Sequence, residues 1–356
     1  MEETTTRTTN ADALLELRDL KLHFFTGEGV VRAVNGASYT VKRGKTLCVV
    51  GESGCGKSVA ARAILNIVHR PGKIVGGEIL YHRPLPSGGA ETIDIAKLPP
   101  RGTAVRRIRG AEIAMIFQEP MTSLSMLHTV GNQIIEAIRL HNRVSEVEAR
   151  ERAIDLLDRV GIPQPEVRID EYPFRLSGGM RQRCMIAMAL SCNPKLLIAD
   201  EPTTALDVTT QAQILDLMQE LQDEYGMSIL FITHDLGVVA EIADDVAVMY
   251  MGNVVERTDV DTLFNAPKHP YTISLLRSIP KIGPARSRLD PIQGMVPSPY
   301  HQLSGCLFHP RCDRAMRGVC DRVVPQPIQL DENHIVECLL YDERYQPAAA
   351  QGGQHG

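Results

Sequence analysis

The chain has 356 residues, of which 44% are hydrophobic and 23% charged, and its formal net charge is -5 from 38 basic and 43 acidic side chains. This composition excludes a disordered or fibrous chain, and the charge excludes a polycationic nucleic-acid binder. The length suits one large core with a smaller appendage. No run approaches the roughly 18 consecutive apolar residues of a membrane span, so any membrane connection is expected to come through a partner.

The N-terminal region begins with a polar, Thr-rich stretch, and we predict a disordered tail at residues 1–12. The stretch lacks a basic segment followed by an apolar core, so we expect no signal peptide and reduced thiols. Short strands are predicted from Leu14, with turn chemistry at Thr26–Gly29. The apolar run Thr46–Val50 is typical of a strand that is buried on both faces of a parallel sheet.

A glycine-rich segment, GESGCGKS, follows that strand and precedes a predicted helix at Val59–Val68. It matches the phosphate-binding pattern G-x-x-x-x-G-K-[ST], in which backbone N–H groups and a helix N-terminus surround phosphates. Lys57 is predicted to reach the β- and γ-phosphates, and Ser58 to bind Mg²⁺. The alternative is a glycine-rich turn without a ligand. The predicted nucleotide-binding residues of this loop are Gly51, Glu52, Ser53, Gly54, Cys55, Gly56, Lys57 and Ser58.

A mainly helical insert is predicted at about residues 119–180, because apolar residues between Thr129 and Val160 recur at three-and-four spacing. Leu176-Ser177-Gly178-Gly179-Met180 then stands before a helical stretch at Arg181–Leu190. Ser177 is a predicted N-cap, and the N–H groups of the two glycines would form a second anion site. Taken alone, the motif would indicate only a capped helix.

Two buried strands, Leu196–Ala199 and Ile229–Ile232, each end in polar residues, as expected where strands deliver chemistry at their carboxyl ends. Beside a phosphate loop, we predict that Asp200 holds the magnesium shell and that Glu201 polarises an attacking water. The alternative is a pair of solvent-exposed acids. A strand, a turn at Gly252-Asn253 and a second strand would complete this domain near residue 260.

These motifs together resemble the ATP-binding subunits of ATP-binding cassette (ABC) transporters, in particular the ATPases of oligopeptide and dipeptide importers. The resemblance covers residues 14–260 through GESGCGKS, MIFQEPMTSL, LSGGMRQR, LLIADEPTTALDV and ITHDL, and continues with HPY and GCLFHPRC. It implies an α/β fold: a RecA-like P-loop NTPase core with a β-rich subdomain, the inserted helical subdomain and a cysteine-rich C-terminal extension. The implied divisions are 13–260 for the nucleotide-binding domain, 261–345 for the extension and 346–356 for a disordered tail.

The resemblance also assigns roles to single residues. Gln118 matches the glutamine that contacts magnesium and senses the γ-phosphate, His234 the switch histidine, and Asp207 the D-loop aspartate. Phe24 lies where the family stacks an aromatic ring on adenine, with Phe25 beside it. The predicted catalytic residues are Lys57, Gln118, Glu201 and His234, and the predicted Mg²⁺ ligands are Ser58, Gln118 and Asp200. The residues that would contact ATP bound to a partner chain are Leu176, Ser177, Gly178, Gly179 and Met180.

The implied function is Mg²⁺-dependent ATP hydrolysis that powers peptide import across the bacterial cytoplasmic membrane. The expected partners are a second, paralogous ABC ATPase subunit, two transmembrane permease subunits and an extracytoplasmic substrate-binding protein, with no nucleic acid. The chain would be a peripheral protein on the cytoplasmic face of the inner membrane. Nickel, oligosaccharide and opine import are alternatives, as is a non-transport ABC ATPase, although the sequence has one phosphate loop and no sustained heptads.

Four of the eight cysteines gather near the C-terminus, at Cys306, Cys312, Cys320 and Cys338. Their spacing is too wide for an ordinary C-x2-C zinc site, but four thiolates can close one tetrahedral site. The alternatives are a 4Fe-4S cluster, a structural zinc ion and free thiols, and the resemblance favours the cluster. His309 lies among these cysteines and is expected to belong to a turn. The scattered cysteines are predicted packing residues: Cys48, Cys55, Cys184 and Cys192.

Overall fold

The structure is a computed structural model that describes residues 12–85, 88–118, 123–204, 206–278, 292–300 and 303–345. The tails predicted at 1–12 and 346–356 therefore lie outside the described residues, apart from Asp12. The same holds for residues 119–122, where the helical insert was predicted to begin. None of the helices in the described ranges has the length and apolarity needed to cross a lipid bilayer.

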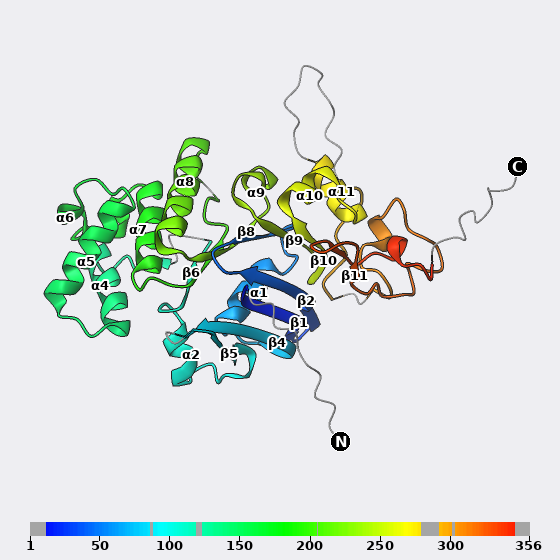
Figure 1. Ribbon diagram of the computed structural model, residues 1–356, viewed down its shortest axis with the longest axis horizontal. Coiled ribbons are helices and arrows are strands. Elements are labelled where there is room, and N and C mark those ends of the chain that lie inside the picture. Colours follow the sequence, from blue (N-terminus) through cyan, green and yellow to red (C-terminus); the bar gives the residue numbers. More distant parts are fainter. Residues whose placement is uncertain are drawn as a thin grey trace, which may run out of the picture.

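Two β-sheets form the centre of the molecule, with helix α1 (Lys57–Ile64) beside both of them (Figure 1). The smaller sheet is antiparallel, with the strand order β2-β1-β4-β5. Its strands are β1 (Ala13–Thr26), β2 (Gly29–Lys42), β4 (Gly72–Pro84) and β5 (Ala90–Asp94). The larger sheet has the order β11-β12-β10-β9-β3-β8-β7-β6. Its parallel strands are β3 (Thr46–Val50), β6 (Ile113–Ile116), β7 (Leu196–Asp200), β8 (Ser228–Thr233) and β9 (Asp245–Tyr250).

The apolar strands of the large sheet are buried on both faces, as the sequence predicted. In β7, Leu196 and Ile198 join the apolar cluster that contains α1 and the small sheet, whereas Leu197 and Ala199 join the cluster formed with the other helices. Successive side chains on a strand point to opposite faces, so a strand between two apolar layers is apolar at every position. The run of small buried residues in α1, which includes Ala60 and Ala61, lets that helix pack closely.

The large sheet continues into the C-terminal extension through antiparallel strands. These are β10 (Asn253–Asp259), β12 (Ile335–Val336) and β11 (Ile328–Gln329). The turn between β9 and β10 lies one residue earlier than predicted, because Asn253 pairs with Tyr250 and belongs to the strand. Met251 and Gly252 take φ values of 45° and 83°, and a two-residue hairpin of this type needs positive φ at both central residues.

The helical insert lies at one end of the molecule (Figure 1). It contains α4 (Val130–His141), α5 (Glu146–Arg159), α6 (Pro165–Arg168), the 3-10 helix η2 (Pro173–Arg175) and the start of α7 (Gly178–Leu190). Thr129, Ser145 and Ser177 cap α4, α5 and α7 by accepting backbone N–H groups, which stabilises each helix start by about 1 kcal/mol. The other helices are α2 (Thr103–Ile108), α8 (Val208–Tyr225), α9 (Leu236–Ile242), α10 (Val260–Asn265), α11 (Pro270–Arg277), η1 (Ile95–Lys97), η3 (His309–Arg311) and η4 (Leu339–Tyr341).

Helix α1 is shorter than predicted, since it ends at Ile64 instead of Val68. Asn66 takes the left-handed conformation with φ 52°, which Asn tolerates better than most residues and which no helix can continue. Its side-chain amide donates to the carbonyl of Leu98 at 2.8 Å, so a contact distant in sequence fixes the helix end. The apolar spacing alone did not reveal this stop.

A buried aromatic cluster holds the C-terminal extension against the sheet. The ring centroids of Tyr250 and Tyr271 are 4.7 Å apart, and Phe308 of the extension lies 5.2 Å from the first and 5.4 Å from the second. His269 packs beside Phe308, and its Nδ1 accepts the N–H of Tyr271 at 3.0 Å at the start of α11. The cluster therefore joins β9, α11 and the extension.

His269 of this cluster makes a contribution to stability that is sensitive to acid. Burial lowers the pKa of His269 to about 3, and only the neutral ring can accept the N–H of Tyr271. Below pH 6.5 the unfolded chain binds a proton that the folded chain excludes, so stability present above pH 6.5 is lost as the pH falls. From pH 7 to pH 5, the loss is about 2 kcal/mol of unfolding free energy.

Urea denaturation of the parent chain and of His269→Gln at the two pH values measures this loss as a difference between the two chains, because Glu337, whose pKa burial raises to about 7, gains stability over the same pH range. His269→Gln keeps an acceptor without a titrating ring and is expected to remove the contribution of His269 from the pH dependence. His128→Gln, a substitution of an exposed histidine, is the control and should leave it unchanged. An equal pH dependence in parent and His269→Gln would contradict the assignment.

Candidate nucleotide site

The glycines of the loop between β3 and α1 are required by space as well as by conformation. Gly51 and Gly56 take φ values of 151° and 102°, which L side chains rarely adopt. A Cβ at Gly51 would lie 2.2 Å from the carbonyl oxygen of Met249, and one at Gly56 would lie 2.1 Å from that of Ala33. Both distances are severe clashes with backbone. The loop can therefore keep this curve only with glycine at both positions.

Lys57 places a positive charge inside the curve of the loop. Its side chain is buried, and its Nζ donates to the carbonyl oxygens of Gly51 at 2.8 Å and Glu52 at 3.1 Å. The N-terminus of α1 begins at the same residue, so the helix dipole adds to the positive potential there. A buried ammonium group beside free helix N–H groups is suited to binding phosphates.

Ser58 and Asp200 meet at the carboxyl ends of β3 and β7. The hydroxyl of Ser58 donates to Asp200 Oδ1 at 2.7 Å, and Asp200 is 0% exposed. Burial raises the pKa of this carboxyl, and the Ser58 hydrogen bond opposes the rise. Among the described residues, Asp200 Oδ2 has no hydrogen-bond partner, although a buried carboxylate oxygen without one is costly. A hydroxyl and an unsatisfied carboxylate oxygen fit Mg²⁺.

The carboxylate of Glu201 connects residues from three strand ends. Its Oε2 accepts Gln118 Nε2 at 2.9 Å and the Thr204 hydroxyl at 3.1 Å, and its Oε1 lies 3.4 Å from Nδ1 of His234. Its backbone has a φ of 48° and is held by a bond from its N–H to the carbonyl of Ile232. The structure thus brings together Gln118, Glu201 and His234, which the sequence placed on separate strands.

Thr204 was missed by the sequence reasoning, although it lies three residues after Glu201 in ADEPTT. Its hydroxyl fixes one Glu201 oxygen, while the other oxygen faces His234, whose side chain is 56% exposed. A carboxylate held in this way can accept a proton from water, and the imidazole can contact a phosphate oxygen.

The LSGGM motif lies apart from the phosphate loop. Leu176 is buried, Ser177 accepts the N–H of Met180 at 3.3 Å, and Gly178 is exposed with no atom within 4 Å of a built Cβ. Figure 1 shows α7 well separated from α1. Within one chain, the structure does not bring these two anion sites together.

Asp207 lies beside the motif at the start of α8. Its two carboxylate oxygens accept the backbone N–H and the hydroxyl of Thr210 at 2.9 and 2.7 Å, and these bonds lower its pKa. Its capping position agrees with the helix-start alternative, and a D-loop role remains a prediction.

The two phenylalanines at the end of β1 have different surroundings. Phe24 packs against the apolar cluster that contains α1, and the ring of the adjacent Phe25 is 46% exposed with Nζ of Lys73 5.8 Å from its centroid. Successive residues of a strand face opposite sides, which explains the difference. The stacking role given to Phe24 remains a prediction.

Burial raises the pKa of Cys338 to about 12, and the neighbouring thiols of Cys306, Cys312 and Cys320 add to the rise. Cys306 N–H donates to the carbonyl of Cys320 at 2.8 Å, and both ring and backbone of His309 bond to Cys306, as expected of a turn residue. Nevertheless, in the described ranges no three His, Cys, Asp or Glu side chains form a group able to hold a metal ion. The 4Fe-4S prediction therefore has no support from the structure.

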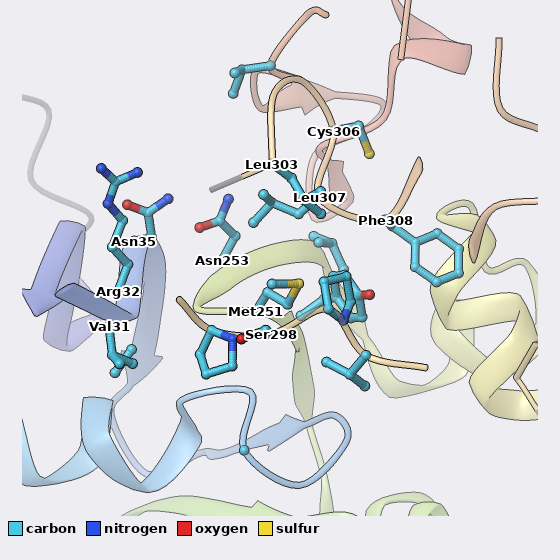
Figure 2. A pocket seen from close by; sticks show the side chains of 18 of the residues that line it. Val31, Arg32, Asn35, Met251, Asn253, Ser298, Leu303, Cys306, Leu307 and Phe308 are labelled. Atoms are coloured by element: carbon cyan, nitrogen blue, oxygen red, sulfur yellow. The ribbon is translucent and has the colours of Figure 1, made fainter. Parts of the chain in front are cut away.

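A cavity of about 820 Å³ separates part of the extension from β2 and the β9–β10 turn. Figure 2 shows Arg32 and Asn35 of β2 facing Leu303 and Leu307 of the extension across it. Ser53 and Gly54 also line the cavity, so the outer side of the phosphate loop is only partly covered by protein.

A parallel sheet with a phosphate loop, an Asp-Glu pair at a strand end and a helical insert bearing LSGGM define an ATP-binding cassette. Family models agree: "ABC transporter" matches residues 34–204, and "Oligopeptide/dipeptide transporter, C-terminal region" matches residues 255–320. The second match begins within β10, before the predicted division at 260. The chain belongs to the ABC transporter ATP-binding proteins, which are ATPases.

Individual relatives share most of their length with this chain. The dipeptide transport ATP-binding protein DppD of Haemophilus influenzae is 45% identical over 340 residues, which cover 96% of this chain and 99% of that protein. The oligopeptide transport ATP-binding protein AppD of Bacillus subtilis is 48% identical over 331 residues, covering 93% and 97%. Among solved structures, the ATP-binding cassette MJ0796, a dimer bound to ADP and Pi, superimposes with a TM-score of 0.59 and 26% identity over 69% of this chain and 98% of its own.

Proposed function

We propose that this chain is the ATP-hydrolysing subunit of a bacterial importer for dipeptides and oligopeptides. The observation that carries the proposal is the pair of contacts Ser58–Asp200 and Glu201–His234, with Lys57 buried in the phosphate loop, in a chain whose C-terminal region matches the oligopeptide/dipeptide transporter model. Relatives named for dipeptide and oligopeptide transport match over nearly their whole length. The alternatives, import of nickel, oligosaccharides or opines, are distinguished by the transport assay described below.

The residues divide the chemistry between them. Lys57 and the N–H groups of the loop bind the phosphates, and Ser58, Asp200 and Gln118 would hold Mg²⁺, which neutralises charge that develops on the phosphates. Glu201 orients a water molecule and takes its proton as the water oxygen attacks the γ-phosphorus. The bond from that phosphorus to the β–γ bridging oxygen then breaks, which releases ADP and phosphate. His234 contacts the γ-phosphate from the neighbouring strand.

ATP would be shared between two chains. Ser177 and Gly178 of the LSGGM motif are exposed and lie apart from the loop of the same chain, and the similar cassette MJ0796 is described as a dimer. We therefore assign a second ABC ATPase, a paralogous sister chain, to the opposite side of the nucleotide. Closure around ATP and release after hydrolysis would switch the attached membrane subunits between their two access states.

The helical insert supplies a surface for those membrane subunits. It exposes several large apolar side chains, which a surface usually keeps scattered or covers with a partner. They are Leu127, Leu140, Val147, Val167, Tyr172 and Phe174. With two permease subunits bound there and an extracytoplasmic binding protein beyond them, the chain would be peripheral on the cytoplasmic face of the inner membrane.

Phosphate release by the complete importer in proteoliposomes tests the cargo. Peptide-loaded binding protein is expected to raise turnover several-fold over binding protein alone. Stimulation by nickel, an oligosaccharide or an opine, with none by peptides, would replace the peptide proposal with the corresponding alternative.

The 4Fe-4S cluster is a separate proposal that rests on the chemistry of the donor set alone, since four cysteine thiolates are the ligands such a cluster takes. Anaerobic purification is expected to yield about four irons and four sulfides per chain. Cys312→Ser should lower both counts, whereas Cys192→Ser, outside the extension, should not. Absence of iron and sulfide from the parent would leave zinc or free thiols.

A further inference from the structure

The C-terminal extension reaches back across the fold to the phosphate loop through one ion pair. Arg311, in η3 between Cys306 and Cys312, donates from Nη1 to Glu52 Oε2 at 2.7 Å and from Nη2 to Glu52 Oε1 at 3.0 Å. Its side chain is only 3% exposed, and its Nε donates to the carbonyl of Gln293. A bidentate pair with a buried guanidinium and a partly exposed carboxylate is stronger and more directional than a fully exposed ion pair.

A second contact reaches the backbone of the same loop residue. The N–H of Glu52 donates to the hydroxyl oxygen of Tyr271 at 2.9 Å. Tyr271 is itself fixed by the aromatic cluster and by the bond from its own N–H to His269. The position of the Tyr271 hydroxyl is therefore fixed by the packing of α11 and does not depend on the loop.

Glu52 is consequently held on three sides. Arg311 binds its carboxylate, Tyr271 accepts its N–H, and Lys57 donates to its carbonyl oxygen at 3.1 Å. The last contact links Glu52 to the ammonium group that would bind phosphate. Beside it, Ser53 and Gly54 border the large cavity instead of packed protein, so other support on that side is sparse.

We propose that Arg311 and Tyr271 are positioning residues of the phosphate loop, through which the C-terminal extension pre-organises the loop for ATP. A loop already held in its binding conformation loses less conformational entropy when the nucleotide binds. This inference rests on the proposed function only in that the loop must bind ATP. It gives the extension a role in nucleotide affinity that its cysteines alone would not provide.

Equilibrium titration of the purified full chain with a fluorescent ATP analogue and Mg²⁺ tests the ion pair. Arg311→Met keeps the apolar stem, removes the two bonds to Glu52 and is expected to weaken binding about 5- to 20-fold. Arg311→Lys keeps the charge without the bidentate geometry and should recover part of the loss. Arg344→Met is the matched control, since Arg344 pairs with Asp342 within the extension and should bind like the parent.

The hydroxyl of Tyr271 is tested in the same way. Tyr271→Phe leaves the N–H of Glu52 without this acceptor and is expected to weaken binding about threefold to tenfold. Tyr341→Phe removes an extension hydroxyl that donates to Lys268 instead, and should leave binding unchanged.

A double-mutant cycle separates positioning from general stability. In a Glu52→Ala background, which removes both oxygens that accept from Arg311, Arg311→Met should change affinity by less than about twofold, because the pair it disrupts is already gone. A full loss in that background would overturn the assignment. So would a parent-like affinity in Arg311→Met accompanied only by a lower melting temperature, which would make the pair a structural brace.

Lys57→Ala distinguishes failure of this inference from failure of the proposed function. It should abolish nucleotide binding if the loop is the ATP site. Undiminished binding by Lys57→Ala would refute the site and the inference together, whereas loss of binding in Lys57→Ala with unchanged binding in Arg311→Met would refute the inference alone.

Discussion

Glu201→Gln is expected to lower ATP turnover at least about 100-fold while leaving ATP binding within about twofold of the parent chain. The amide is nearly isosteric with the carboxylate and can still contact Thr204, but it cannot take a proton from water. The substitution does not touch the residues that would hold the phosphates and Mg²⁺. Lys57 still bonds to Gly51, and Ser58 still bonds to Asp200. The substitution therefore removes chemistry rather than binding.

Phosphate release and analogue binding, measured on the same purified chain with Mg²⁺, check this result. Glu220→Gln, on the exposed side of α8, is the matched control and should behave as the parent. Parent-like turnover in Glu201→Gln would remove Glu201 as the base and leave the role to another group.

Gly178→Asp is the second large effect expected, with turnover falling about 50-fold and ATP binding to the isolated chain unaffected. No atom lies within 4 Å of a Cβ built at Gly178, so the fold should tolerate the side chain. A carboxylate at this exposed helix start would instead repel the phosphates of ATP bound to the other chain.

Gly27→Asp, in the open turn between β1 and β2, adds the same charge away from the motif and is the control. Turnover is measured in the assembled importer, and binding on the isolated chain. If ATP affinity of the isolated Gly178→Asp chain fell as much as turnover in the assembled importer, the motif would contact the ATP of its own chain. That result would contradict a site shared between two chains.

Much of the nucleotide site could be predicted from the sequence because its residues lie at fixed distances from buried strands. Asp200 ends β7 and Glu201 follows it, His234 follows β8, and Lys57 and Ser58 follow β3, so a parallel sheet necessarily gathers them at one edge. The buried strands also predicted the α/β class, and the three-and-four spacing of apolar residues predicted the helical insert.

What could not be predicted depends on contacts between distant segments. No spacing or periodicity connects Glu52 with Arg311, 259 residues later, or places the hydroxyl of Tyr271 against the loop. The end of α1 at Ile64, just before Asn66, and the packing of Phe24 rather than Phe25 likewise depend on neighbours in space. The HPY sequence pointed only to a family, whereas the structure gives His269 and Tyr271 physical roles.

The C-terminal extension is therefore structurally integrated with the nucleotide-binding domain rather than a separate appendage. Its short strands continue the central sheet, its Phe308 completes a buried aromatic cluster, and its Arg311 binds the phosphate loop. A rearrangement of the segment from Cys306 to Cys312 would therefore change the affinity for ATP. By reciprocity, bound ATP would stabilise that segment.

The central claim, that ATP hydrolysis by this chain drives peptide import, is tested most directly by uptake of a radiolabelled dipeptide pool into bacteria whose only copy of the chain carries Glu201→Gln. Accumulation is expected to fall to the level of cells without the chain and to return when the parent chain is restored. Peptide accumulation equal to that of parent cells would contradict the claim.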